Sequence, residues 1–183
     1  LPIAEYGFFE VAKYSSETTE LHSFILMNVL SPNVHSCSEF VSNSDMLSTE
    51  FTYILLKKIA RACLALETDG IVHGDFHWGN IIVSVKNAYI DIPFKKLTDD
   101  QFDIILIDFG FSTALIPELK HYDLNSLYIS SLSYPNNSKF RSRLRKLMMK
   151  RTSISESILL DIQSFYKMYA KQKEILFQKL NLD

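Results

Sequence analysis

Two short polar motifs, each next to an apolar run, constrain this sequence more than any other feature. The first is His-Gly-Asp-Phe-His-Trp-Gly-Asn at residues 73–80, between a helical pattern and the β-branched run at residues 81–85. The second is Asp-Phe-Gly at residues 108–110, which ends another apolar run. Together they give H-x-D-x-x-x-x-N followed by D-F-G, the order in which phosphoryl-transfer enzymes place their catalytic and metal-binding loops. Either motif alone is weak, but both in this order and context indicate phosphoryl transfer.

The residue types in these motifs fit that chemistry. Phosphoryl transfer needs an in-line nucleophile and cations on the phosphate oxygens. Asp75 is spaced to accept or orient a substrate hydroxyl proton, while Asn80 and Asp108 offer the oxygen ligands that Mg²⁺ prefers. We expect Gly110 to let the backbone turn sharply after the strand. We expect His73 to brace the loop by hydrogen bonding rather than to titrate.

Composition favours a globular intracellular protein. Apolar residues make up 47% of the 183 residues and aromatic residues 13%, which is enough for a hydrophobic core. The net charge of -2 argues against nucleic-acid binding through overall charge. Cys37 and Cys63 show neither metal-ligand spacing nor a disulfide framework, so we interpret them as reduced thiols. No apolar run approaches the ~18 residues of a membrane span, and no signal peptide is visible. We therefore expect a cytoplasmic or nuclear location.

The first part of the chain is predicted to be a strand pair followed by helices. β-rich runs at residues 7–14 and 22–30, separated by a polar segment, predict an antiparallel hairpin. A short helix is expected at residues 37–41. Apolar residues at intervals of three and four predict a long helix over residues 49–68, with Ser48 or Thr49 as its cap and Gly70 as a left-handed stop.

The rest of the chain alternates short strands with a helical tail. We expect strands at residues 81–85, 88–92 and 102–107, with a polar loop at residues 93–101. Further helices are expected at residues 119–131 and 139–151. A capping box at Ser153 and Glu156 predicts one more, which reaches Leu180 either continuously or with a break near Ala170. Because the strands are segregated from the helical body, the fold class is α+β.

Residues 24–131 resemble the protein-kinase-like superfamily, and the two motifs carry the resemblance. It implies a helical C-lobe at residues 31–183 and a remnant of N-lobe strands and hinge at residues 1–30. The hinge backbone at Met27 and Asn28 would bind the adenine of ATP, and Asn80 and Asp108 would bind Mg²⁺. Asp123 would hydrogen-bond the catalytic-loop backbone, and it also fits a helix N-cap.

Two departures distinguish the sequence from ordinary protein kinases. Position 77 is His where those kinases have Lys, so the loop looks more like that of aminoglycoside phosphotransferases, choline kinases and UbiB-like proteins. KEOPS and RIO kinases are comparably compact. His77 would either act in catalysis, by donating to a γ-phosphate oxygen, or pack beside Trp78. Only residues 111–122 separate D-F-G from the next helix and no A-P-E motif follows, so the peptide platform is missing.

The phosphate-covering part of an N-lobe is not visible in the sequence. There is no Gly-rich loop, and Lys13, in a Val-Ala-Lys context, lies too close to the hinge-like run for the helix that should intervene. We expect the missing elements upstream of Leu1, on another chain, or nowhere.

Three functions therefore remain open. The first is an atypical kinase that uses ATP and Mg²⁺ to phosphorylate Ser or Thr hydroxyls of proteins. The second is a small-molecule kinase of the aminoglycoside or choline type, and the third is a catalytically incomplete kinase-like interaction module.

A separate feature is the basic helix from Lys139 to Arg151, which contains no acid. It is either a solvated face or a patch for an acidic partner, RNA or a membrane surface.

Overall fold

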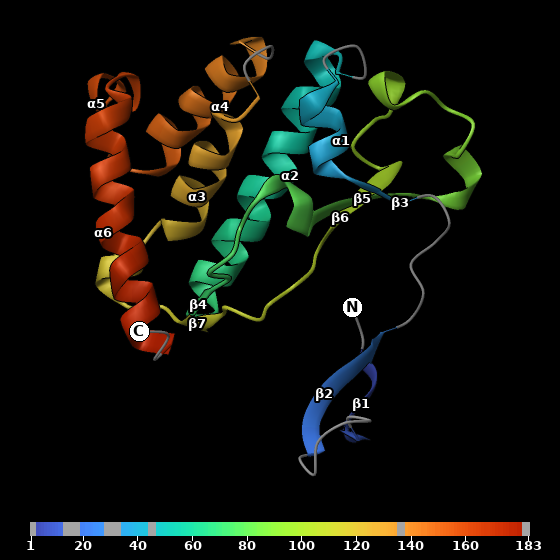
Figure 1. Cartoon of the computed structure of the whole chain (residues 1–183). Helices are drawn as coiled ribbons and strands as arrows, with labels where there is room; N and C mark the ends of the chain where they lie inside the picture. The colour runs from blue at the N-terminus through green and yellow to red at the C-terminus, as the bar shows by residue number, and fades with distance from the viewer. Residues whose placement is uncertain (1–2, 13–18, 28–33, 44–46, 135–137, 181–183) are drawn as a thin grey trace. The chain divides into compact units, whose positions relative to one another are not determined.

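The chain divides into two compact units, Leu1–Pro32 and Asn33–Asp183. The computed structural model describes residues 3–12, 19–27, 34–43, 47–134 and 138–180. The first unit is an antiparallel hairpin of β1 (Ile3–Ala12) and β2 (Thr19–Met27), with Ala12 opposite Thr19 (Figure 1). The predicted hairpin is confirmed, while Lys13 lies outside the described residues.

The second unit contains a three-stranded antiparallel sheet in the order β3-β5-β6 (Figure 1). Its strands are β3 (Val34–Ser36), β5 (Ile81–Val85) and β6 (Phe102–Leu106). The central strand β5 alternates buried and half-buried residues, so that Ile81, Val83 and Val85 all face the core. Because β5 begins at the residue that follows Asn80, the sheet fixes the end of the first polar motif.

The predicted strand at residues 88–92 is wrong. Lys86 N–H donates to Gln101 O (3.0 Å), which closes the β5–β6 ladder just before this segment and leaves the segment to form turns. The chain there makes two short 3₁₀ helices, η3 (Asn87–Tyr89) and η4 (Phe94–Lys96). The apolar residues that produced the strand pattern, Tyr89 and Ile92, pack against the core from this loop instead.

Two helices, α1 (Cys37–Ser42) and α2 (Thr49–Thr68), pack against the sheet. Both confirm the sequence prediction. At the start of α2, Ser48 Oγ accepts the Phe51 N–H at 3.0 Å, which satisfies one of the unpaired donors of the first turn. Past its end, Gly70 has a φ of +72°, a left-handed conformation that costs glycine little. The helix therefore stops just before the first polar motif.

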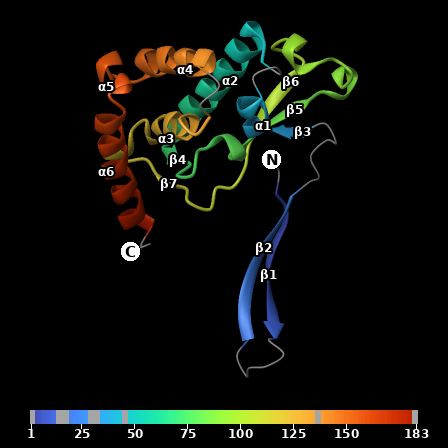
Figure 2. The ribbon, with the colours of Figure 1, turned by 45° about the horizontal axis from the view of Figure 1, so that its top comes forward.

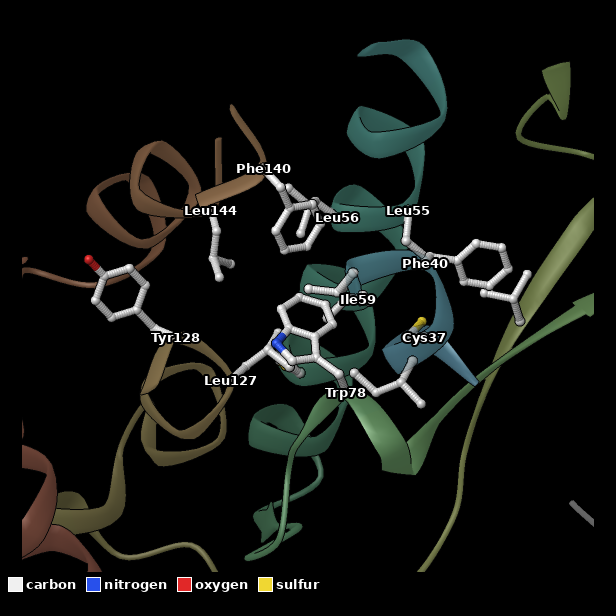
Figure 3. Close-up of a cluster of buried hydrophobic side chains, with 14 of the residues drawn as sticks. Cys37, Phe40, Leu55, Leu56, Ile59, Trp78, Leu127, Tyr128, Phe140 and Leu144 are labelled. Atoms are coloured by element: carbon white, nitrogen blue, oxygen red, sulfur yellow. The ribbon is translucent and has the colours of Figure 1, made fainter. Parts of the chain in front are cut away.

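The core of the second unit lies where α1 and α2 meet α3 (Tyr122–Ser131) and α4 (Ser138–Arg151), as Figures 2 and 3 show. Trp78 is fully buried there, with its ring edge-to-face against Phe140 at 5.0 Å. Cys37 and Cys63 are also buried, and burial raises the pKa of both thiols. Each large side chain buried in this way stabilises the fold by about 1.5–3 kcal/mol.

The C-terminal helices are α5 (Glu156–Leu160) and α6 (Ile162–Leu180). Two details of the prediction are wrong: α5 begins after Ser155 rather than Ser153, and the chain breaks at Asp161 rather than near Ala170. Asp161 causes the break because its carboxylate accepts the N–H (3.2 Å) and the hydroxyl (2.7 Å) of Ser164, which starts a new helix. Every helix in the described part of the chain is too short or too polar to cross a membrane.

Candidate active site

The two polar motifs lie side by side because backbone bonds join the segments that carry them. β4 (Ile71–Val72), just before the first motif, pairs with β7 (Thr113–Ala114), just after the second (Figure 1). On the other side, Ile107 N–H donates to Asn80 O at 3.1 Å, which links the end of the first motif to the start of the second. The two loops are thus tied together at both ends.

The loops also touch at Gly74, where there is no room for a side chain. Gly74 has a φ of +85°, and a Cβ atom there would lie 2.0 Å from the Phe111 carbonyl oxygen. Only glycine combines this backbone conformation with so close an approach. In the second loop the left-handed residue is Asp108, at φ +61°, rather than Gly110, to which we assigned the turn. Aspartate tolerates this conformation through local bonds, here Oδ1 accepting the Gly110 N–H at 3.4 Å.

His73 is fully buried and bonded on both ring nitrogens. Its Nε2 donates to Ile107 O (3.0 Å), and its Nδ1 accepts the Asp75 N–H (3.4 Å), which requires the neutral ring with the proton on Nε2. Burial lowers the pKa of His73, although the bond to Ile107 and the nearby carboxylates oppose this. The ring also contacts Phe109, with 4.4 Å between centroids. His73 therefore connects the two loops as an uncharged group.

Asp123 holds the first loop from the first turn of α3. Its two carboxylate oxygens accept the N–H groups of His73 (2.9 Å) and Gly74 (3.1 Å). Burial raises the pKa of Asp123 to about 6, and the two N–H donors counteract part of that effect. The N-cap position of α3 is His121, so Asp123 is not the helix cap. Two bonds from one carboxylate fix both the position and the orientation of the loop backbone.

A second brace, which the sequence did not predict, joins Glu67 to His121. Glu67 Oε1 lies at the end of α2 and accepts bonds from the His121 N–H (2.9 Å) and Nδ1 (3.0 Å). His121 has a φ of +62°, so the pair holds a left-handed residue in place at the start of α3. It secures α3, and with it Asp123, against the helix that leads to the loop. A non-glycine residue needing a left-handed backbone gives no local sequence signal.

Asp75, His77 and Asn80 lie close together in the first loop, and Asn80 is hydrogen-bonded to Asp75. Asn80 Nδ2 donates to the Asp75 backbone oxygen (2.9 Å) and to its Oδ2 (3.2 Å). His77 Nε2 lies 3.5 Å from the same Oδ2, while its Nδ1 accepts the Gly79 N–H at 3.0 Å. His77 therefore faces Asp75 with a side chain that is 42% exposed, whereas Trp78 is buried beneath the loop.

The oxygen donors on the two loops fit a hard divalent cation. Asn80 uses its amide nitrogen on Asp75, and the side-chain bonds recorded for it within the described residues all go through Nδ2, so Oδ1 is left for a ligand. Asp108 is solvent-exposed, and among the residues that the structure describes its carboxylate makes only the long bond to Gly110. The described residues contain no group of three or more His, Cys, Asp or Glu side chains that could by themselves hold a metal ion. A cation held here would thus take its remaining ligands from water and phosphate oxygens, as Mg²⁺ commonly does.

The remaining predicted site residues belong to the first unit. Met27 is the last residue of β2, and Asn28 lies outside the described residues, so the adenine contact assigned to both stays a prediction.

Three features together define a protein-kinase-like fold. A long helix leads to the Asp75 loop, and a strand leads to Asp108. A later helix braces the first loop through Asp123. Comparison with known families agrees: the ABC1 atypical kinase-like domain matches residues 32–140. The chain belongs to the ABC1 atypical kinase-like family. The predicted α+β kinase-like fold class and the resemblance to atypical kinases are both confirmed.

A solved structure gives independent support for the fold. The structure is similar to that of WaaP in complex with acyl carrier protein, with a TM-score of 0.57 and 20% sequence identity. The match covers 94% of this chain and 67% of the WaaP chain. Comparison with curated protein sequences gave no match.

Proposed function

We propose that this chain is an ATP- and Mg²⁺-dependent phosphotransferase that transfers the γ-phosphate to a hydroxyl group. The observation that carries the proposal is that the Asp75 carboxylate is both open to solvent and hydrogen-bonded within its own loop. It is 39% exposed, its Oδ2 accepts a hydrogen bond from Asn80 Nδ2 (3.2 Å), and His77 Nε2 lies 3.5 Å from the same oxygen. A carboxylate so held can receive or orient a hydroxyl proton without first reorganising. Membership of an atypical kinase-like family supports the same reaction class.

In the proposed reaction, the acceptor oxygen attacks the γ-phosphorus, the bond to the β-phosphate oxygen breaks, and ADP leaves. The hydroxyl proton passes toward Asp75. Asn80 and Asp108 are the residues that would hold Mg²⁺, which when bound neutralises charge on the phosphate oxygens. His77 would orient the Asp75 carboxylate. Met27 and Asn28 stay in the proposal as the adenine contacts.

We favour a small hydroxylated molecule as the acceptor, which reverses the order drawn from the sequence. The segment after D-F-G pairs at once with β4, and Leu115 N–H donates to Gly70 O at 2.7 Å. η5 (Pro117–Leu119) then leads into α3. Little chain is left to form a platform for an extended peptide. The second candidate is a Ser/Thr protein kinase, which the exposed rings of Phe109 (43%) and Phe111 (39%) favour as contacts for a larger acceptor.

Nucleotide binding tests the proposal first, by calorimetric titration of ATP with and without Mg²⁺. Asp108→Ala should abolish the metal-dependent binding, because it removes the anionic ligand. Asp91→Ala, an exposed acid in the loop between β5 and β6, is the matched control and should bind normally. Asp75→Asn should keep nucleotide binding and lose phosphate transfer. Unchanged binding in Asp108→Ala would show that Asp108 is not a ligand.

The acceptor is then identified with γ-labelled ATP. We would offer aminoglycosides and amino alcohols in one series, and unstructured proteins rich in Ser and Thr in another. Labelling of a small molecule supports the favoured acceptor, and labelling of proteins alone supports the second candidate. If the wild-type chain binds no ATP in the presence of Mg²⁺, the catalytic proposal fails and the non-catalytic interaction module takes its place.

A further inference from the structure

A groove of about 690 Å³ runs between α2 and α4, away from the loops that carry Asp75 and Asp108. α4 lies next to α2 in Figures 1 and 2. The lining residues recur on each helix at intervals of three or four, so one continuous face of each helix forms a wall. The groove is therefore a regular helix-to-helix feature rather than an irregular gap.

The floor of this groove is apolar. Leu56 and Ala60 from α2 are buried at its base, and Leu147 from α4 is half-buried beside them. Tyr53 lies on the same α2 face, one turn before Leu56 and Lys57, and 66% of its surface is exposed. An aromatic ring this exposed above an apolar floor offers contact area that the described part of the chain leaves uncovered.

The rim of the groove is strongly basic. Five cations line it against a single acid, Glu50, although the whole chain has a net charge of -2. The cations are Lys57, Arg143, Lys146, Lys150 and Arg151. Lys57 lies 3.9 Å from Asp99. The four rim cations that come from α4 form no ion pair within the described residues.

A purely structural explanation covers only part of this rim. Lys150 and Arg151 lie in the last turn of α4, where cations offset the helix dipole. Arg143 and Lys146 lie in the middle of the helix, where that effect is negligible. Lys146 and Lys150 also repel each other at a spacing of four residues. The fold does not require this concentration of charge, which points to a negatively charged occupant.

We infer that the groove binds an acidic amphipathic helix of a partner protein. An apolar stripe on that helix would lie over Leu56, Ala60 and Leu147, and acidic residues on either side of the stripe would meet the basic rim. The concave shape favours a helix over a lipid bilayer, since a flat surface cannot reach a floor that lies between two helices. The apolar floor favours a protein over RNA, whose binding relies mainly on phosphate contacts. The inference is independent of the proposed function, because no groove residue belongs to the candidate active site.

The test uses a panel of fluorescent helical peptides of about 18 residues, with Leu along one face and Glu on its flanks. Binding is followed by fluorescence anisotropy at two salt concentrations, with scrambled peptides of the same composition alongside. We expect the amphipathic peptides to bind and the scrambled peptides not to. Lys146→Glu with Lys150→Glu should weaken binding at least about tenfold, because two attractions become repulsions. Tyr53→Ala should weaken it without changing the salt dependence.

The matched control is Lys167→Glu with Lys171→Glu, which makes the same change at the same spacing on the exposed face of α6. This variant should bind the peptides like the wild type, and circular dichroism checks that each variant is folded. Hydrogen exchange should show protection of α2 and α4 on binding. The inference is overturned if no peptide of the panel binds, if scrambled peptides bind equally, or if the control variant loses as much affinity. It is also overturned if only anionic phosphatidylglycerol vesicles or poly(U) bind at the basic rim.

Discussion

Replacing Gly74 with alanine isolates the backbone contact between the two loops, and Gly70 supplies a matched control. Both glycines have φ angles in the left-handed region, +85° for Gly74 and +72° for Gly70. A Cβ atom at Gly74 would lie 2.0 Å from Phe111 O, whereas a Cβ atom at Gly70 would meet nothing within 4 Å. The two variants therefore share the backbone strain, and only Gly74→Ala adds the steric contact.

The expected magnitudes follow from these two contributions. A left-handed conformation costs an L-residue about 1–2 kcal/mol, which both variants share. At Gly74 the Phe111 carbonyl would have to move by more than about 1 Å to reach a normal contact distance. Forced repacking of this kind costs about 1–3 kcal/mol more. We expect the free energy of unfolding to fall by about 1–2 kcal/mol in Gly70→Ala and by about 2–5 kcal/mol in Gly74→Ala.

Urea titrations followed by circular dichroism measure both changes under the same conditions. Calorimetric titration with ATP and Mg²⁺ adds a second measurement. A shift of Phe111 would also displace the neighbouring D-F-G loop, so Gly74→Ala should lose nucleotide affinity while Gly70→Ala keeps it. Equal losses of stability in the two variants would refute the reasoning, because the close approach of the loops would then cost nothing.

Two further predictions concern buried titratable groups. Because burial raises the pKa of Asp123 to about 6 from 3.8, the folded chain binds a proton more tightly than the unfolded chain. The free energy of unfolding should therefore decrease, by at most about 3 kcal/mol, as the pH rises from about 4 to about 6. Urea titrations across this pH range should show the decrease in the wild type and lose it in Asp123→Asn. If the free energy of unfolding of Asp123→Asn falls with pH as steeply as that of the wild type, the decrease comes from other groups. Cys37 and Cys63 should react with Ellman's reagent only on unfolding, since both thiols are buried with raised pKa values. Rapid reaction of the folded chain would contradict the burial.

Local sequence signals were sufficient where local interactions decide the structure. α2 runs from Thr49 to Thr68 as predicted, because its apolar spacing, its Ser48 cap and its Gly70 stop all act within a few residues of the chain. The strand β5 follows in the same way from its β-branched residues Ile81, Ile82, Val83 and Val85, which favour extended backbone. The order of the two polar motifs indicated the protein-kinase-like superfamily before any contact between them was known, and the family comparison agrees.

Long-range contacts account for what the sequence did not reveal. The apolar pattern at residues 88–92 is real, but the residues are buried from turns because the β5–β6 ladder has already closed. The bond between Glu67 and His121 joins groups from two helices far apart in the chain, and no periodicity encodes it. Gly74 is an intermediate case. Its place in His-Gly-Asp is visible in the sequence, but the need for glycine there becomes clear only from the position of Phe111.

Trp78 gives this chain a built-in optical reporter. It is the only tryptophan in the sequence, so its emission can be assigned without labelling. The residue lies within the loop that carries Asp75 and Asn80, while its ring touches Phe140 on α4, the helix that forms one wall of the groove (Figure 3). Rearrangement of the loop and movement of α4 should therefore both change the surroundings, and so the emission, of the same indole ring. Stopped-flow measurements of this single fluorophore can time both events in the unmodified protein.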